Sequence, residues 1–130
     1  MSDYLDRAKV LRADTETHYN CNQATLIPFA EDEIPVDQIM RMNTYFGSGM
    51  RMGSVCGAIT GGLMALGLKG KGDGATLQKY YKALREKHGS LNCADLLRKA
   101  KEEGLPQKQH CDGMVFECVQ LVEELLKEEE

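Results

Sequence analysis

The chain has 130 residues, a formal net charge of −4 and five cysteines. Its length is that of one ordinary domain, which can bury a hydrophobic core without help from disulfide bonds. The acidic balance argues against binding to nucleic acid or to an anionic membrane surface, because proteins of those classes present a basic field. We therefore expect residues 1–130 to form a single domain that works with other kinds of partner.

Helical periodicity recurs along the chain, and runs of strand-forming residues are nearly absent. In chain order, helices are predicted over residues 3–15, from Asn20 to about Phe29, from Pro35 to Tyr45, from Val55 to Leu68, over residues 75–88, after a cap at Asn92 or Ser90, and from about Gln109 to Lys127. Ser54 is the expected N-cap of the fourth helix, and Gly89 is the expected end of the fifth. The sequence thus predicts an all-α fold, a single compact domain of about six to seven helices.

The most apolar stretch, residues 55–68, is shorter than the roughly 20 residues that span a bilayer. The N-terminal residues are charged and contain no apolar signal core. These features predict a cytoplasmic protein with no membrane insertion. In a reducing compartment, cysteines serve redox chemistry or metal binding more often than structural disulfides.

Four of the five cysteines lie at or near predicted helix starts: Cys21, Cys56, Cys93 and Cys111. The first turn of a helix leaves N–H groups unpaired and carries partial positive charge, which stabilises a thiolate. Thiolates are the reactive form of cysteine and also the ligands of metals and iron–sulfur clusters. We therefore predict that the four cysteines form one site, catalytic or metal-binding.

Buried packing is the alternative for each cysteine, because free cysteine often behaves as a small hydrophobic residue. Packing is the favoured interpretation of Cys118, whose neighbours Val115, Val119 and Val122 form an apolar helix face. The chain contains no CxxC, the signature of zinc knuckles and thioredoxin-like motifs. Only the fold could bring the four cysteines together.

Glycines surround Cys56: Gly47, Gly49 and Gly53 precede it, and Gly57 follows it. We expect Gly49, Gly53 and Gly57 to belong to the site, because small residues let backbone N–H groups approach a thiolate or a cluster sulfur. A phosphate-binding loop is disfavoured, because neither the P-loop lysine pattern nor a βαβ context is present. His18 and His110 lie near cysteines and are candidates to activate a thiolate or supply a ligand.

The spacing of Gly57 and Gly61 is that of a small helix face. In a membrane, this spacing would suggest helix dimerisation. In this chain it predicts a close helix crossing in the core, with a homodimer interface as the alternative.

The segments around the cysteines resemble the redox-active protein family named for the pattern C_GCAxxG_C_C. The matching residues are Asn20-Cys21, Phe46-Gly47-Ser48-Gly49-Met50, Cys56-Gly57-Ala58-Ile59-Thr60-Gly61, Gly89-Ser90-Leu91-Asn92-Cys93 and Cys111. The order of the four cysteines matches, although the core reads Cys-Gly-Ala here and Gly-Cys-Ala in the family name. The resemblance covers roughly residues 18–126.

The resemblance implies a redox role. A related domain in cytochromes of the split-Soret type holds an iron–sulfur cluster on cysteines, which makes such a cluster a candidate cofactor here. The chain has no CxxCH, so a covalently attached haem is not expected.

The leading hypothesis is a redox-active protein that performs electron transfer or thiol/disulfide chemistry at the four-cysteine site for a redox partner protein. The site either holds an iron–sulfur cluster or cycles between thiols and disulfides. Whether the protein is an oxidoreductase or an electron carrier stays open. The alternatives are a non-enzymatic module that binds zinc through the same thiolates, and a helical interaction module without a cofactor.

Overall fold

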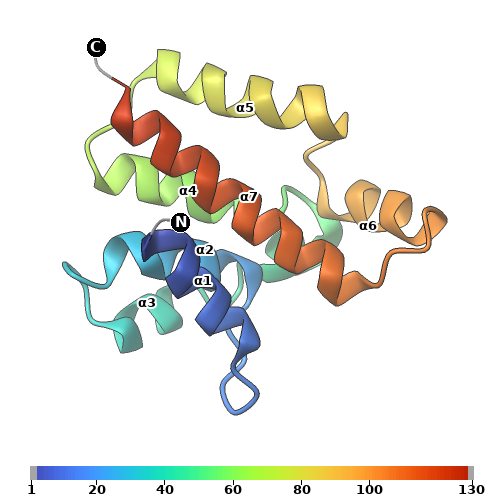
Figure 1. Cartoon of the computed structure of the whole chain (residues 1–130), viewed down its shortest axis with the longest axis horizontal. Helices are drawn as coiled ribbons and strands as arrows, with labels where there is room; N and C mark the ends of the chain where they lie inside the picture. Colours follow the sequence, from blue (N-terminus) through green and yellow to red (C-terminus); the bar gives the residue numbers. More distant parts are fainter. Residues whose placement is uncertain (1–2, 129–130) are drawn as a thin grey trace.

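The structure, a computed structural model, describes residues 3–128 (Figure 1). Its elements are α1 (Asp3–Ala13), α2 (Cys21–Ala30), α3 (Val36–Met42), the short π-type turn η1 (Gly49–Gly53), α4 (Gly57–Leu68), α5 (Gly74–His88), α6 (Cys93–Glu102) and α7 (Gln107–Lys127). No strand forms within these residues, apart from one isolated bridge between Val55 and Asn92. The predicted all-α fold is confirmed.

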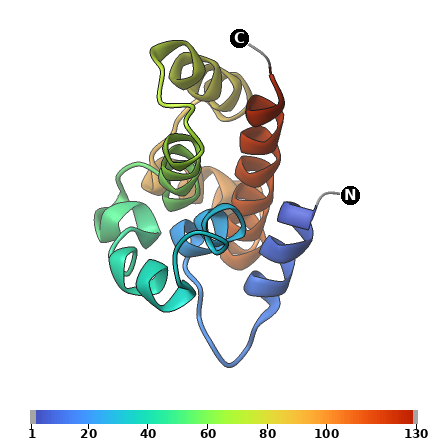
Figure 2. The same ribbon diagram turned by 90° about the vertical axis from the view of Figure 1, so that its left-hand side faces the viewer.

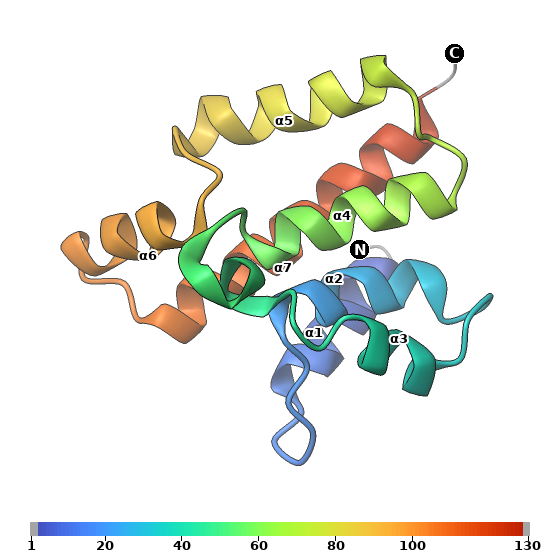
Figure 3. The same ribbon diagram turned by 180° about the vertical axis from the view of Figure 1, so that it is seen from behind.

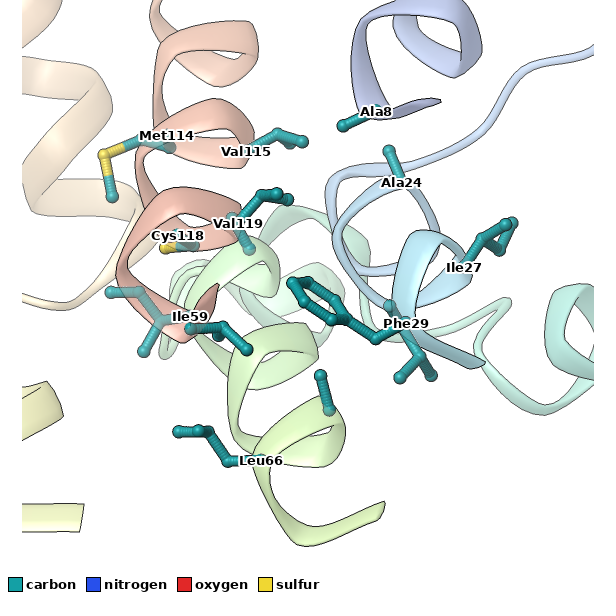
Figure 4. Packing of buried hydrophobic residues seen from close by; sticks show 14 of the residues in the cluster. Ala8, Ala24, Ile27, Phe29, Ile59, Leu66, Met114, Val115, Cys118 and Val119 are labelled. Atoms are coloured by element: carbon teal, nitrogen blue, oxygen red, sulfur yellow. The ribbon is translucent and has the colours of Figure 1, made fainter. Parts of the chain in front are cut away.

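The helices share one hydrophobic core, which is centred on α2. Every residue of α2 after Cys21 is buried, because α1, α3, α4 and α7 all pack around it. Phe29 of α2, Ile59 of α4 and Val119 of α7 come together in this core (Figure 4). Each such side chain contributes about 1.5–3 kcal/mol when it leaves water, so this cluster is the main source of stability.

The small face of α4 lies directly on α2. A Cβ atom on Gly61 would stand 2.7 Å from the carbonyl oxygen of Asn22, which leaves no room for a larger residue. The predicted close helix crossing is therefore confirmed. α2 of the same chain therefore occupies the face that carries Gly57 and Gly61.

Helix boundaries differ from the prediction around the cysteines. α7 begins at Gln107, two residues earlier than expected, so Cys111 lies a full turn inside the helix. Ser54 does not cap α4: its N–H donates to the carbonyl of Gly49 at 2.9 Å and closes η1, while Cys56 takes the cap position. The glycine loop expected before Cys56 is thus an ordered turn rather than an open loop.

The cap of α2 explains why this helix starts where it does. The Asn20 side chain accepts a hydrogen bond from the N–H of Gln23, and the Gln23 side chain accepts one from the N–H of Asn20, both at 2.8 Å. Asn20 Nδ2 also donates to the carbonyl of Asn43 at 3.1 Å. This capping box fixes the first turn of α2 against the end of α3.

The starts of α2, α4 and α6 and the first turns of α7 converge around η1, as seen from behind the molecule in Figure 3. α5 lies at the opposite end from the connection between α1 and α2 (Figure 2). Among the described residues, no helix has the length and apolar character needed to cross a bilayer.

Candidate functional site

A pocket of about 450 Å³ lies where the helix starts converge, and all four predicted site cysteines line it. Cys21 is the first residue of α2, Cys56 directly precedes α4, Cys93 is the first residue of α6, and Cys111 is the fifth residue of α7. All are free thiols. Four segments that span 90 residues of the sequence therefore deliver one thiol each to the same cavity.

Cys118 does not belong to this pocket. Its side chain is fully buried in the core beside Tyr80, whose hydroxyl donates to the carbonyl of Ile59 at 2.9 Å. Figure 4 shows Cys118 among the apolar residues of α7 and α4. Its predicted packing role is confirmed.

The bridge between Val55 and Asn92 brings the segments of Cys56 and Cys93 side by side. The Cys56 N–H donates to the carbonyl of Leu91 at 2.9 Å, and the Cys93 N–H donates to the carbonyl of Ser54 at 2.6 Å. Because side chains alternate along paired segments, Cys56 and Cys93 point to the same face of the bridge as diagonal neighbours. Two backbone hydrogen bonds thus set the positions of two pocket thiols.

The three glycines expected in the site each permit a close approach. A Cβ atom on Gly57 would lie 2.6 Å from the sulfur of Cys21, so Gly57 leaves room for the sulfur of Cys21 beside the start of α4. Cβ atoms on Gly49 and Gly53 would lie 2.8 Å and 2.9 Å from the Cβ atoms of Cys93 and Ala94. These glycines let η1 pack against the first turn of α6.

The backbone at the start of η1 is strained. Ser48, Gly49, Met50 and Arg51 have φ values of +53°, +62°, +59° and +59°, four consecutive residues in the left-handed region. Each non-glycine residue there costs about 1–2 kcal/mol, and such strain concentrates at functional sites. Ser48 lines the cysteine pocket, so this strained turn is part of its wall.

Burial favours the protonated form of three pocket thiols, Cys56, Cys93 and Cys111. It raises the pKa of Cys56 to about 12 and that of Cys111 to about 11, and it also raises the pKa of Cys93. The charge of Cys21 adds to each of these shifts. For Cys56, N–H groups of the first turn of α4 act in the opposite direction, but burial outweighs them. The expectation that helix starts make the cysteines acidic is therefore wrong for Cys56, Cys93 and Cys111.

One wall of the pocket is polar, and sequence reasoning missed its main residue. Arg12 of α1 has a side chain that is only 9% exposed, and its Nε donates to Asp112 Oδ1 at 2.6 Å. The available signal was its position four residues after Ala8 and seven after Leu5, on the buried stripe of α1.

Both predicted histidines also line the pocket: His18 is exposed, and His110 is half-buried. Burial lowers the pKa of His110, which favours its neutral form. Neither side chain makes a contact that assigns it the role of a base or a ligand, so those roles stay predictions.

The side chains around the pocket include four candidate metal ligands, the cysteine thiols. Within residues 3–128, no group of three or more His, Cys, Asp and Glu side chains is arranged to hold a metal ion. A zinc ion requires its sulfur ligands at about 2.3 Å, so the sulfurs must crowd together. An iron–sulfur cluster is larger, and its cysteine ligands stand farther apart. Four thiols line one cavity, and four cysteines are the donor set that an iron–sulfur cluster uses.

Comparison with known protein families relates the chain to redox proteins. The family model described as "Putative redox-active protein (C_GCAxxG_C_C)" matches residues 19–125. No curated protein and no solved structure shows a significant match to the chain. The matched range contains η1 and the four cysteines that line the pocket. The chain therefore belongs to the C_GCAxxG_C_C family of redox-active proteins.

Proposed function

We propose that the protein is an electron-transfer protein in which Cys21, Cys56, Cys93 and Cys111 hold an iron–sulfur cluster. The observation that carries this proposal is the convergence of four free thiols, from four separate helices, on one cavity of about 450 Å³. Family membership supports the redox role and leaves the chemistry of the site open.

The protonation of the thiols favours a cluster over thiol/disulfide exchange. A thiol with a pKa near 11 or 12 is almost entirely protonated at neutral pH, and the protonated form is a poor nucleophile. Metal centres bind thiolates and release their protons on binding, so they supply positive charge directly to the four sulfurs.

The chain's own residues have separable tasks in this proposal. The four cysteines would ligate the cluster, which supplies reversible one-electron chemistry when bound. The bridge at Val55 and Asn92 orients two of the ligands. The apolar lining residues Leu11, Leu96 and Met114 limit the access of water to the sulfurs. All four ligands come from one chain, so a second copy is not needed to complete the site.

A disulfide between Cys21 and Cys56 is the second candidate. The charge of Cys21 raises the pKa of Cys56, and Gly57 lets the sulfur of Cys21 approach the start of α4. Closing this disulfide would pass two electrons and two protons to an oxidised partner protein. For both candidates we propose a cytoplasmic location, where the environment keeps free cysteines reduced between reaction cycles.

Anaerobic purification followed by iron and sulfide analysis tests the proposal. We expect bound iron and sulfide, with visible absorption that bleaches on reduction by dithionite. Cys56→Ser should lose most of the iron, whereas the matched control Cys118→Ala should retain it. Colourless protein that takes up no iron during reconstitution would reject the cluster. Stoichiometric zinc would then support the metal-binding alternative, and loss of two thiols on oxidation would support the disulfide.

A further inference from the structure

Arg12 places a buried positive charge at the cysteine pocket. Its side chain is only 9% exposed and lines the cavity. Burying an arginine costs several kcal/mol of desolvation unless its charge and its N–H groups are satisfied. The partners of Arg12 therefore decide how much positive charge it leaves at the pocket.

The contacts of Arg12 connect two of the cysteine segments. Its Nε donates to Asp112, the residue after Cys111, and its Nη1 donates to the carbonyl of Tyr19 at 2.9 Å, two residues before Cys21. The guanidinium is thus anchored on α7 and on the chain entering α2. This anchoring holds its charge at a defined place in the wall of the pocket.

The charge of Arg12 is not fully neutralised by its partner. Lys108 also contacts Asp112, with its Nζ 3.2 Å from both carboxylate oxygens. Two cations therefore share one carboxylate, which leaves this group with a net positive charge. The other charged residue that lines the pocket, Asp14, is exposed, so solvent screens its carboxylate more strongly.

A positive group beside the sulfurs stabilises the site most when the site becomes anionic. Arg12 lines the same cavity as Cys111, and its Nε donates to Asp112, the residue that follows Cys111. Net charge near a cluster is one of the factors that set its reduction potential.

We propose that Arg12 is a positioning residue that stabilises the reduced, more negatively charged state of the occupied cysteine site and so raises its reduction potential. This inference rests on the proposed cluster. Reduction adds one electron to the site, with no bond formed and no proton required. In a titration, dithionite supplies that electron.

Arg7 is a matched control on the same helix. It forms an ion pair with Glu31 at 2.9 Å and is 37% exposed, and it does not line the cysteine pocket. Arg7→Gln removes an ion pair between α1 and the end of α2 without changing the charge at the site. Arg12→Lys keeps the positive charge in the pocket but cannot reproduce both hydrogen bonds.

The experiment measures the midpoint potential of the reconstituted full-length protein by dithionite titration, together with its iron content. Arg12→Gln should shift the potential to a more negative value, whereas Arg12→Lys and Arg7→Gln should stay close to the wild type. Asp112→Asn should shift the potential in the opposite direction, because it removes the negative partner of Arg12. A merely structural role would not produce shifts of opposite sign.

The outcomes separate this inference from the proposed function. Wild-type protein that takes up no iron rejects the cluster, and the role of Arg12 falls with it. Wild-type protein that loads normally, with an unchanged potential in Arg12→Gln, rejects the role of Arg12 alone. If Arg12→Gln fails to load, Asp112→Asn decides: an unchanged or more negative potential in that variant overturns the inference.

Discussion

The core between α2, α4 and α7 and the pocket at the starts of these helices both bury cysteine, but they surround it differently. In the core, Cys118 has apolar neighbours and a hydrogen-bonded tyrosine, and it does not line the cysteine pocket. In the pocket, four thiols face one cavity beside a strained turn and a buried arginine.

This difference teaches that burial alone does not identify a functional cysteine. Burial raises the pKa of Cys118 as well as the pKa values of Cys56 and Cys111. Two things distinguish the pocket: four thiols converge on it, and some of its features lower the free energy of unfolding. Left-handed backbone and a desolvated cation both lower stability, and a fold retains such features where a function depends on them.

The largest effect that we expect comes from pH. The pKa of Cys56 is raised from 9.0 to about 12, so the folded state keeps a proton that the unfolded state loses. The stability contributed by this shift is fully present below pH 9 and is lost as the pH rises toward 12. The shifted thiol of Cys56 costs about 1.4 kcal/mol per pH unit in this window, so Cys56 alone should remove about 1–2 kcal/mol by pH 10. Burial also raises the pKa values of Cys93, Cys111 and Cys118, so these thiols add to the loss in the same direction.

Urea denaturation of the reduced, cluster-free protein at pH 7, 8, 9 and 10 measures this loss. Cys56→Ala should make the free energy of unfolding depend less on pH, because it removes one thiol with a raised pKa. Cys118→Ala should also reduce the fall in the free energy of unfolding with pH, because core and pocket thiols both contribute to it. Cluster loading should remove only the contribution of the pocket thiols. A midpoint that stays constant from pH 7 to pH 10 would contradict the buried, protonated thiols.

A smaller effect should come from Gly57→Ala, which tests the close approach at the pocket. The new Cβ would lie 2.6 Å from both the Cys21 sulfur and the Phe46 carbonyl oxygen, so the start of α4 must shift. Overpacking of this kind costs about 2 kcal/mol, and we expect bound iron to fall with it.

Gly67→Ala is the control on the same helix. A Cβ atom there meets no other atom within 4 Å, and alanine favours the helix by roughly 0.5–1 kcal/mol. Equal effects of the two substitutions on the urea midpoint would mean that Gly57 has no special place beside Cys21.

The smallest effect that we expect concerns the strained turn. Met50 has a φ of +59° and is 47% exposed, so Met50→Gly relieves backbone strain and removes few contacts. The free energy of unfolding should rise by about 1 kcal/mol, with the iron content unchanged. Glycine substitution of the exposed, helical Val10 should instead lower it by a similar amount. A destabilised Met50→Gly variant would argue against strain at this turn.

The sequence predicted the core more completely than the pocket, for a physical reason. Helical periodicity is local, so it revealed the seven helices and the packing role of Cys118. The four cysteines were also identified, but their convergence depends on contacts between segments far apart in the chain. The left-handed turn at residues 48–51 could not be predicted from the sequence, because three of its four residues ordinarily avoid positive φ. The low acidity of the thiols followed from burial, which no local pattern reports.

The positions of the four cysteines in the sequence also set the order in which the parts of the site can form during synthesis. Cys21 and Cys56 belong to helices that pack directly on each other, whereas Cys111 is delivered by the last helix. Synthesis proceeds from the N-terminus, and a ribosome would still hold the segment around Cys111 when α2 and α4 are already free to pair. A growing chain therefore has no complete pocket to fill. The four-cysteine site can form only once α7 has left the ribosome.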